Sequence, residues 1–430
     1  MTSPTLDVFE RHESAVRSYV RSFPDVFTTA KGHLVRSESG REYIDFFAGA
    51  GALNYGHNDD GMKAALLEYI SGDGIAHALD MGTTAKARFL ERFHEVLLAP
   101  RGLEHRVLFP GPTGTNAVET ALKLARKVTG REKIVSFTNA FHGMTLGSLA
   151  VTGNSFKRGG AGLPLDNTVF MPFADFLDEG FDSLSYLERM LENGGSGMDL
   201  PAGVIVETVQ GEGGINAASF GWLKRLNDLC ARWDLPLIVD DIQAGCGRTG
   251  PFFSFEPAGI KPDIICLSKS LSGYGLPMAL VLVRPDMDLF GPGEHNGTFR
   301  GNSMAFVTAT EALRFWEDDT LTQDVLRKGE IVQEALEAMA AKHPDLKPDV
   351  RGRGLMRGLG LGAEGAANAV CAEAFKGGVI METSGPASEV AKLLPPLTIP
   401  EAALRQGLDV MAKAVDTVAE RIAKDQPAAA

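Results

Sequence analysis

Short apolar runs alternate with amphipathic stretches through the middle of this chain. The runs are rich in Val and Ile and are apolar at nearly every position, which is typical of strands that helices cover on both faces. Two stretches between them, residues 115–129 and 221–233, carry apolar residues at helical spacing. This alternation predicts an α/β fold with a mostly parallel sheet flanked by helices. The expected strands are residues 133–137, 168–172, 203–208, 236–240, 264–268 and 278–283.

The two ends of the chain have a different pattern. Residues 27–47 contain short apolar runs separated by a turn sequence, which predicts a small β meander. Toward the other end, helical segments alternate with short strands. We therefore expect both ends to build a smaller α+β lobe, with residues 1–58 as its N-terminal segment and residues 326–430 as its C-terminal part. Residues 59–325 would form the large domain.

Composition and charge narrow the class of protein. The chain has 430 residues, of which 44% are hydrophobic and 23% charged, as in ordinary globular proteins. Its formal net charge of −13 repels phosphate backbones, so we predict no nucleic-acid partner. The four cysteines form no Cys-x-x-Cys pair, so neither zinc nor disulfides are expected. No run suits a membrane span or a signal peptide, and we expect a cytoplasmic protein without membrane contact.

Lys269 and Asp240 are the strongest candidates for chemistry. Each ends an apolar run, and a Gly-rich turn at residues 245–250 lies between them. Because open α/β sheets bind ligands beyond the carboxyl ends of their strands, both side chains are expected at a ligand site. An amine and a carboxylate suit pyridoxal 5′-phosphate there: the amine forms an imine, and the carboxylate keeps the ring nitrogen protonated. The alternative for Lys269 is a surface lysine at a strand end.

Further residues fit the same cofactor, each with a simpler alternative. Gly114 and Thr115 open a predicted helix whose free N–H groups could bind the phosphate, although an ordinary helix cap has the same sequence. Phe141 could stack on the ring or be a core residue. Gln243 could hydrogen-bond the phenolic oxygen. For Asp240 and its neighbour Asp241 the alternatives are a metal ligand pair and a helix N-cap. No further metal ligand recurs nearby, so no metal is expected.

Three more residues complete the set of candidates. Thr298, in a Gly-punctuated loop, could donate to a phosphate. Arg351 lies in a tight turn, and arginine binds carboxylates in a fork geometry. His142 has no visible partner and is interpreted as part of the wall.

The order and spacing of these features are more specific than any one of them. The segments that carry the pattern are residues 43–46, 56–58, 113–117, 141–143, 207–211, 240–243, 247–250, 269 and 298–302. Through them, from about Lys31 to Met411, the chain resembles the class III aminotransferases. These are fold-type I pyridoxal-phosphate enzymes that include the ornithine and 4-aminobutyrate aminotransferases.

The resemblance implies a role in cofactor binding for each matching residue. Lys269 would hold the cofactor covalently and move the proton. Asp240 would pair with the pyridine nitrogen and Gln243 with the phenolic oxygen. The turn Gly114-Thr115 would bind the phosphate, and Phe141 would stack on the ring.

The resemblance also implies roles toward the partner subunit and the substrates. Thr298 would reach the phosphate of a neighbouring subunit, which predicts a homodimer or higher homo-oligomer with shared active sites. Arg351 matches the position that binds a substrate α-carboxylate. Glu212 matches an acid that pairs with Arg351 when the amino donor has no need of it, and Glu207 is placed beside the substrate. A swinging Glu212–Arg351 pair would avoid a buried unpaired charge.

Two segments, residues 46–58 and 267–277, look most like the branch of this family that acts on 2,4-diaminobutyrate. We therefore expect interconversion of L-2,4-diaminobutyrate and 2-oxoglutarate with L-aspartate 4-semialdehyde and L-glutamate, as in ectoine biosynthesis. The alternatives are another ω-aminotransferase for ornithine, acetylornithine or 4-aminobutyrate, an aminomutase or decarboxylase, and a non-catalytic cofactor-binding regulator. Met144 stands where ornithine aminotransferases have an arginine for the distal carboxylate of 2-oxoglutarate, and Asp241 where the family usually has Glu.

Overall fold

A seven-stranded sheet forms the centre of residues 5–177 and 180–425, the part of the chain that a computed structural model describes. Its strands are β4 (Arg106–Leu108), β5 (Ile134–Phe137), β6 (Thr168–Met171), β7 (Gly203–Val206), β10 (Leu237–Asp240), β11 (Ile264–Leu267) and β12 (Leu280–Val283). The order is β4-β12-β11-β10-β7-β5-β6, in which β12 alone runs antiparallel to its neighbours. The predicted mostly parallel sheet is confirmed. Strand β4 was not predicted, because three residues are too few to show a pattern.

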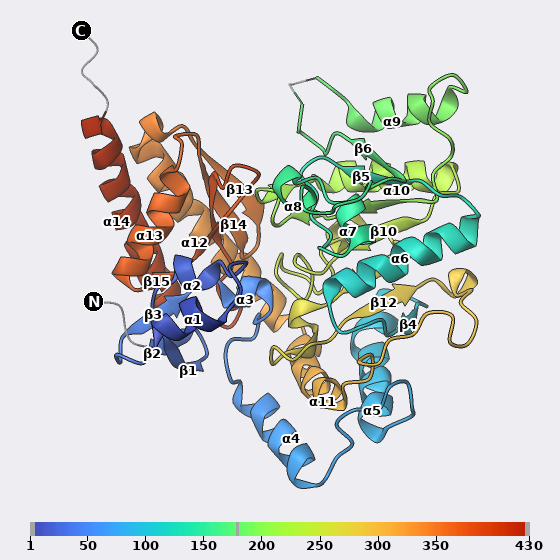
Figure 1. Ribbon diagram of the computed structural model, residues 1–430, viewed down its shortest axis with the longest axis horizontal. Helices are drawn as coiled ribbons and strands as arrows, with labels where there is room; N and C mark the ends of the chain where they lie inside the picture. The colour runs from blue at the N-terminus through green and yellow to red at the C-terminus, as the bar shows by residue number, and fades with distance from the viewer. Residues whose placement is uncertain (1–4, 178–179, 426–430) are drawn as a thin grey trace.

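Helices cover both faces of this sheet (Figure 1). On one face, α6 (Gly114–Thr129) packs Val118 and Leu124 into a core that contains Ile238 and Ile264 of the strands. On the other face, α10 (Phe220–Arg232) contributes to the core that contains the alternate strand residues. Burial on both faces explains why the strands are apolar at nearly every position. The other helices and short strands of this region are α4 (Asp60–Ser71), α5 (Thr84–Phe93), α7 (Leu146–Ala150), α8 (Ser155–Arg158), α9 (Ser183–Glu192), α11 (Ser303–Ala312), β8 (Val209–Gln210) and β9 (Asn216–Ala217).

The two ends of the chain meet in one of two smaller sheets. The predicted meander forms as β1 (Phe27–Lys31), β2 (Leu34–Ser37) and β3 (Glu42–Asp45), and β3 pairs in parallel with β15 (Val379–Ile380). A second sheet has the order β13-β14-β17-β16. Figure 1 shows the blue N-terminal and red C-terminal segments side by side. The remaining strands and helices are β13 (Pro348–Arg353), β14 (Met356–Leu361), β16 (Glu382–Ser384), β17 (Val390–Leu393), α1 (Leu6–His12), α2 (Tyr19–Ser22), α3 (Ala48–Gly51), α12 (Thr320–Lys342), α13 (Ala366–Gly377) and α14 (Glu401–Asp425).

Arg248 joins the central region to both ends of the chain. Its guanidinium is fully buried and donates to Asn54 Oδ1 at 2.6 Å and to the carbonyls of Leu355 at 3.2 Å and Pro395 at 2.5 Å. Burial lowers the pKa of Arg248 to about 9. Because a buried charge is costly unless hydrogen bonds satisfy it, these contacts fix the smaller sheets against the large one.

Among the described residues, no helix combines the length and hydropathy needed to cross a lipid bilayer. No group of three or more His, Cys, Asp and Glu side chains there could hold a metal ion.

Candidate active site

Asp240 and Lys269 lie at the same edge of the central sheet. Asp240 is the last residue of β10, and Lys269 follows β11, the parallel neighbour of β10. A cavity of about 190 Å³ lies at this edge. It brings together the predicted site residues except Thr298 and Arg351; its lining residues are Gly114, Thr115, Phe141, His142, Gly143, Glu207, Glu212, Asp240, Ile242, Gln243 and Lys269.

The backbone at Lys269 is strained. Its φ of 48° lies in the left-handed region of backbone conformation, which residues other than glycine rarely adopt. The turn is held by Ser270, whose Oγ donates to the Gly51 carbonyl at 2.7 Å and accepts from Asn54 N–H at 3.0 Å. Burial lowers the pKa of Lys269, although the charge of Glu212 opposes this. A lowered pKa makes the neutral, nucleophilic amine more accessible.

His142 is the partner of Asp240, so its interpretation as a wall residue without a partner is wrong. His142 Nδ1 lies 2.7 Å from Asp240 Oδ2, and Asp240 Oδ1 accepts from Ile242 N–H at 3.2 Å. Burial disfavours the protonated ring, but the hydrogen bond to Asp240, its charge and that of Glu207 raise the pKa of His142. His142 therefore holds the Oδ2 oxygen of Asp240 at the wall of the cavity.

Glu207 holds two loops beside the cavity. Its Oε1 accepts from Phe141 N–H at 2.9 Å, and its Oε2 accepts from Gly211 N–H at 3.1 Å. Burial raises the pKa of Glu207 to about 7, partly offset by the nearby His142. Glu207 therefore fixes the backbone that carries Phe141, and both residues line the cavity.

The N-terminus of α6 forms one wall of the cavity. Gly114 is the first residue of this helix, and a capping box between Thr113 and Asn116 fixes its start. Thr115 Oγ1 lies 2.7 Å from Thr145 Oγ1 and 2.9 Å from Ser148 Oγ. The wall is closely packed, because a Cβ added at Gly143 would lie 2.4 Å from Thr115 Oγ1. Free N–H groups at a helix start beside hydroxyl donors suit a phosphate.

The residues that line the cavity have the polar groups that pyridoxal phosphate would need. Gln243 is a buried residue of the cavity lining, and Nε2 donates to the Ala50 carbonyl at 3.0 Å. Gln243 Oε1 is buried and has no hydrogen-bond partner among the described residues. An unsatisfied buried polar atom next to an amine, a carboxylate and a helix N-terminus is expected where a polar ring and a phosphate bind.

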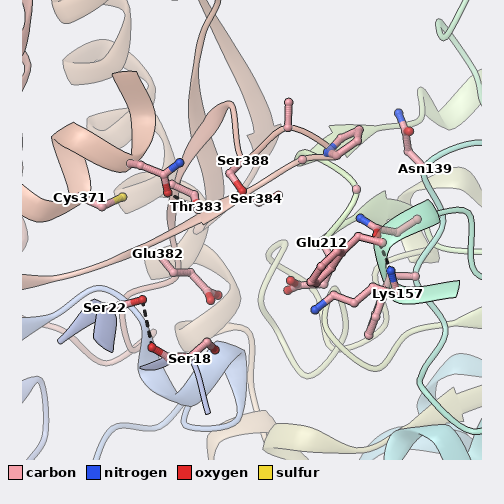
Figure 2. Close-up of a pocket in the computed structure, with 18 of the residues that line it drawn as sticks. Ser18, Ser22, Asn139, Lys157, Glu212, Cys371, Glu382, Thr383, Ser384 and Ser388 are labelled. Carbon is pink, nitrogen blue, oxygen red and sulfur yellow. Dashed lines mark hydrogen bonds between the residues drawn. The ribbon is translucent and has the colours of Figure 1, made fainter. Parts of the chain in front are cut away.

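A larger pocket of about 860 Å³, which we call the distal pocket, adjoins the cavity (Figure 2). Phe141 and Glu212 line both spaces. The smaller cavity alone is below the usual size of a ligand site, whereas the two together can hold a cofactor and a substrate.

Glu212 pairs with Lys392 in the structure, and not with Arg351 as predicted. Glu212 Oε1 instead accepts from Lys392 Nζ at 2.7 Å and from Gln243 Nε2 at 3.3 Å. Burial disfavours the carboxylate, but the charges of Lys392 and Lys269 lower the pKa of Glu212. Lys392 has no exposed side-chain area, and its Nζ also lies 2.8 Å from Glu382 Oε1. Glu212 and Glu382 therefore stabilise the charge of Lys392 and raise its pKa, although its burial has the opposite effect.

Arg351 lies in a different cavity, of about 560 Å³. Strand β13 directs its guanidinium to Asp349, to the Gly214 carbonyl at 3.1 Å and toward Asn216. Arg351 is therefore separated from the cavity that contains Lys269.

Thr298 also lies outside the cavity. It is exposed, and its carbonyl oxygen is 2.7 Å from His77 Nε2. The neighbouring Phe299 is 65% exposed. Within one chain, Thr298 does not contribute to the cavity that the other predicted residues line.

Comparison with known proteins identifies close relatives over nearly the whole chain. The family described as Aminotransferase class-III matches residues 16–415. The chain is 59% identical over 420 residues to a diaminobutyrate–2-oxoglutarate transaminase of Halalkalibacterium halodurans, covering 98% of each protein. It is 60% identical over 415 residues to a protein of the same name from Sporosarcina pasteurii, covering 96% of this chain and 97% of that one.

Solved structures show the same architecture. The ornithine aminotransferase of Toxoplasma gondii ME49 superposes with a TM-score of 0.85 at 28% sequence identity, covering 97% of this chain and 95% of that one. A transaminase from the marine bacterium Virgibacillus superposes with a TM-score of 0.86 at 20% identity, covering 98% of this chain and 100% of that one. At 20% identity, this second likeness supports the fold alone.

Proposed function

The chain belongs to the class III aminotransferase family, which depends on pyridoxal phosphate, and we propose that it acts on L-2,4-diaminobutyrate. The amine would pass to 2-oxoglutarate, giving L-aspartate 4-semialdehyde and L-glutamate. Relatives that bear the name diaminobutyrate–2-oxoglutarate transaminase support this substrate, because they share 56–60% identity over nearly full length. The observation that carries the chemistry is the convergence of Lys269, Asp240 and His142 on one cavity.

Each residue of the cavity has a role in this proposal. The bound cofactor supplies an electron sink for the substrate carbon. Lys269, with its lowered pKa, would take and return the proton at that carbon. Asp240, paired with His142, would hold a proton on the ring nitrogen. Gly114 and Thr115 would bind the phosphate, Phe141 would contact the ring face, and Gln243 would bind the phenolic oxygen.

Lys392 is the cation that we propose for the substrate carboxylate, in place of Arg351. Its partner Glu212 lines the cavity with Lys269, whereas Arg351 does not. Two acids hold the Lys392 ammonium. Glu212 can therefore give way to a substrate carboxylate while Glu382 keeps the buried ammonium paired.

Replacing Lys392 with methionine is expected to lower kcat/KM for 2-oxoglutarate by about 10- to 100-fold, because a hydrogen bond to a charged group contributes roughly 1.5–3 kcal/mol. The change would appear mainly in KM, measured by steady-state kinetics at saturating amino donor. Lys392→Arg should retain most of the affinity, since it keeps the charge. The matched control is Lys376→Met, on an exposed lysine that pairs with Glu373. An unchanged KM in Lys392→Met would refute the role.

We also propose a homodimer or higher homo-oligomer in which Thr298 contributes to the phosphate site of the neighbouring subunit. The exposure of Thr298, outside the cavity of its own chain, supports this arrangement. A cytoplasmic location and a place in ectoine biosynthesis stay predictions.

Product identification tests the proposed function. The purified protein, loaded with pyridoxal phosphate, is given L-glutamate and one aldehyde at a time: aspartate 4-semialdehyde, glutamate 5-semialdehyde, N-acetylglutamate 5-semialdehyde or succinate semialdehyde. We expect the highest kcat/KM with aspartate 4-semialdehyde and a 1:1 yield of diaminobutyrate and 2-oxoglutarate. A preference for another aldehyde would indicate an ornithine, acetylornithine or 4-aminobutyrate aminotransferase. Turnover without an oxo-acid partner would indicate a mutase or decarboxylase, and an absence of turnover would favour a regulator.

A further inference from the structure

Lys157 lines the distal pocket, and the proposed chemistry does not use its charge. This lysine of α8 is exposed, and Figure 2 places it on the side of the pocket opposite Glu382. Its ammonium group has no hydrogen-bond or ion-pair partner among the described residues. The other lining cation among those residues, Arg21, donates to the carbonyls of Ala15 and Arg17. The ammonium of Lys157 is therefore available to an anionic group of a ligand.

The two acids that line the distal pocket already have cations of their own. Glu212 and Glu382 share Lys392, whose Nζ lies 2.7 Å from one carboxylate and 2.8 Å from the other. The nearby charge of Lys269 also stabilises the carboxylate of Glu212. Because these acids are compensated, the charge of Lys157 is a surplus positive charge at the wall of the pocket, which favours a ligand with a negative group.

Hydrogen bonds fix α8 relative to the loop that carries Phe141. Gly153 N–H donates at 2.8 Å to the carbonyl of Ala140, the residue before Phe141. At the end of α8, Arg158 donates to three backbone carbonyls of the segment that precedes the helix, at 2.9–3.3 Å. Since Phe141 lines both the cofactor cavity and the distal pocket, these bonds set the position of Lys157 relative to both spaces.

The two proposed substrates carry a carboxylate at the same separation from the carbon that reacts. In diaminobutyrate, three carbon–carbon bonds join the carbon that bears the γ-amine to the carboxylate carbon. In 2-oxoglutarate, three carbon–carbon bonds join the keto carbon to the far carboxylate carbon. Only 2-oxoglutarate has a second carboxylate on the reacting carbon itself, which is the group proposed above for Lys392. One cation beyond the reacting carbon can therefore serve both substrates.

We propose that Lys157 binds this far carboxylate in both half-reactions: the α-carboxylate of diaminobutyrate and the γ-carboxylate of 2-oxoglutarate. The inference rests on the proposed function for the identity of the substrates. Lysine suits the role, because its ammonium is a compact charge on a flexible stem that can follow a carboxylate presented by two different molecules. Lys157 would then hold both substrates, whereas Lys392 would meet only a substrate with a carboxylate on its reacting carbon.

The test measures Lys157→Met with both substrates and with a ligand that lacks the far carboxylate. We expect kcat/KM for diaminobutyrate and for 2-oxoglutarate each to fall by about 10- to 100-fold, mainly through KM. Calorimetry on the pyridoxal-phosphate form, which does not transaminate an oxo acid, gives dissociation constants. The constant for 2-oxoglutarate should rise by about 10- to 100-fold, and that for 2-oxobutyrate should change by less than about threefold. Lys157→Arg keeps the charge and should stay within about threefold of the wild type in every measurement.

Lys413→Met is the matched control, because Lys413 is also exposed, has no ion-pair partner among the described residues and lies on α14, outside both pockets. Equal weakening of 2-oxoglutarate and 2-oxobutyrate, or equal losses in Lys157→Met and Lys157→Arg, would show a structural role and overturn the inference. A loss confined to one of the two substrates would overturn it as well. If the wild type failed to transaminate diaminobutyrate, the proposed function would be wrong, and the binding of 2-oxoglutarate would still decide the role of Lys157.

Discussion

Lys269→Ala is expected to lower kcat by at least about 10⁴-fold. The substitution removes both the covalent attachment of the cofactor and the base that moves the proton, and a positioned base alone typically contributes about 10²–10⁴-fold. Turnover of glutamate with aspartate 4-semialdehyde gives the first readout. The second is chemical: after borohydride reduction, mass spectrometry should find the cofactor attached to Lys269 in the wild type and to no residue in the variant.

The control for this experiment is Lys261→Ala, on an exposed lysine that donates to the Gly102 carbonyl at 2.9 Å. Alanine at position 269 inherits the positive φ, so Lys269→Gly is the companion variant that relieves the strain. If either variant at position 269 kept more than about 1% of the wild-type kcat, the assignment of this lysine would be wrong.

Asp240→Asn is expected to reduce kcat by about 10²–10³-fold, the usual cost of removing one fixed electrostatic partner from an active site. An amide has no negative charge to stabilise a protonated ring nitrogen. The cofactor would therefore be a poorer electron acceptor in the variant. The cofactor dissociation constant should also rise, because the variant leaves the buried His142 without its carboxylate. Equilibrium dialysis of the cofactor and steady-state kinetics measure the two effects.

Asp263→Asn is a suitable comparison, because Asp263 lies at the opposite edge of the same sheet. Its carboxylate accepts from Leu237 N–H at 2.8 Å, at the start of the strand that Asp240 ends. We expect this variant to lower the free energy of unfolding by about 1–3 kcal/mol while the cofactor dissociation constant stays near that of the wild type. Equal cofactor affinity in Asp240→Asn and the wild type would contradict the role of Asp240.

Local sequence pattern was sufficient to predict every strand of the central sheet except β4, and the position of Asp240 and Lys269. The strands are apolar on both faces, so their ends are visible in the sequence, and parallel strands bring those ends to one edge. The Gly114-Thr115 turn was predictable for a similar reason, because a helix start has a recognisable capping sequence.

The ion pairs of the site could not be predicted in the same way. His142 and Asp240 are 98 residues apart, and Glu212 and Lys392 are 180 residues apart, so no local pattern connects them. Arg351 was preferred because arginine binds carboxylates well, but its strand directs it toward Asp349. One signal was available for Lys392: it is the sole charge within the apolar run of residues 390–394, and a charge inside a strand that is otherwise core requires a partner.

The positive φ of Lys269 has a consequence for how this lineage can change. Lys269 has a buried amine and a backbone conformation that costs of order 1–3 kcal/mol. Both features lower the stability of the fold, and the catalytic role explains why they are kept. In a descendant that no longer needed turnover, selection for stability would act against this lysine before most others. Duplicated copies that have lost the reaction should therefore carry glycine or asparagine at this position while their sheets remain unchanged.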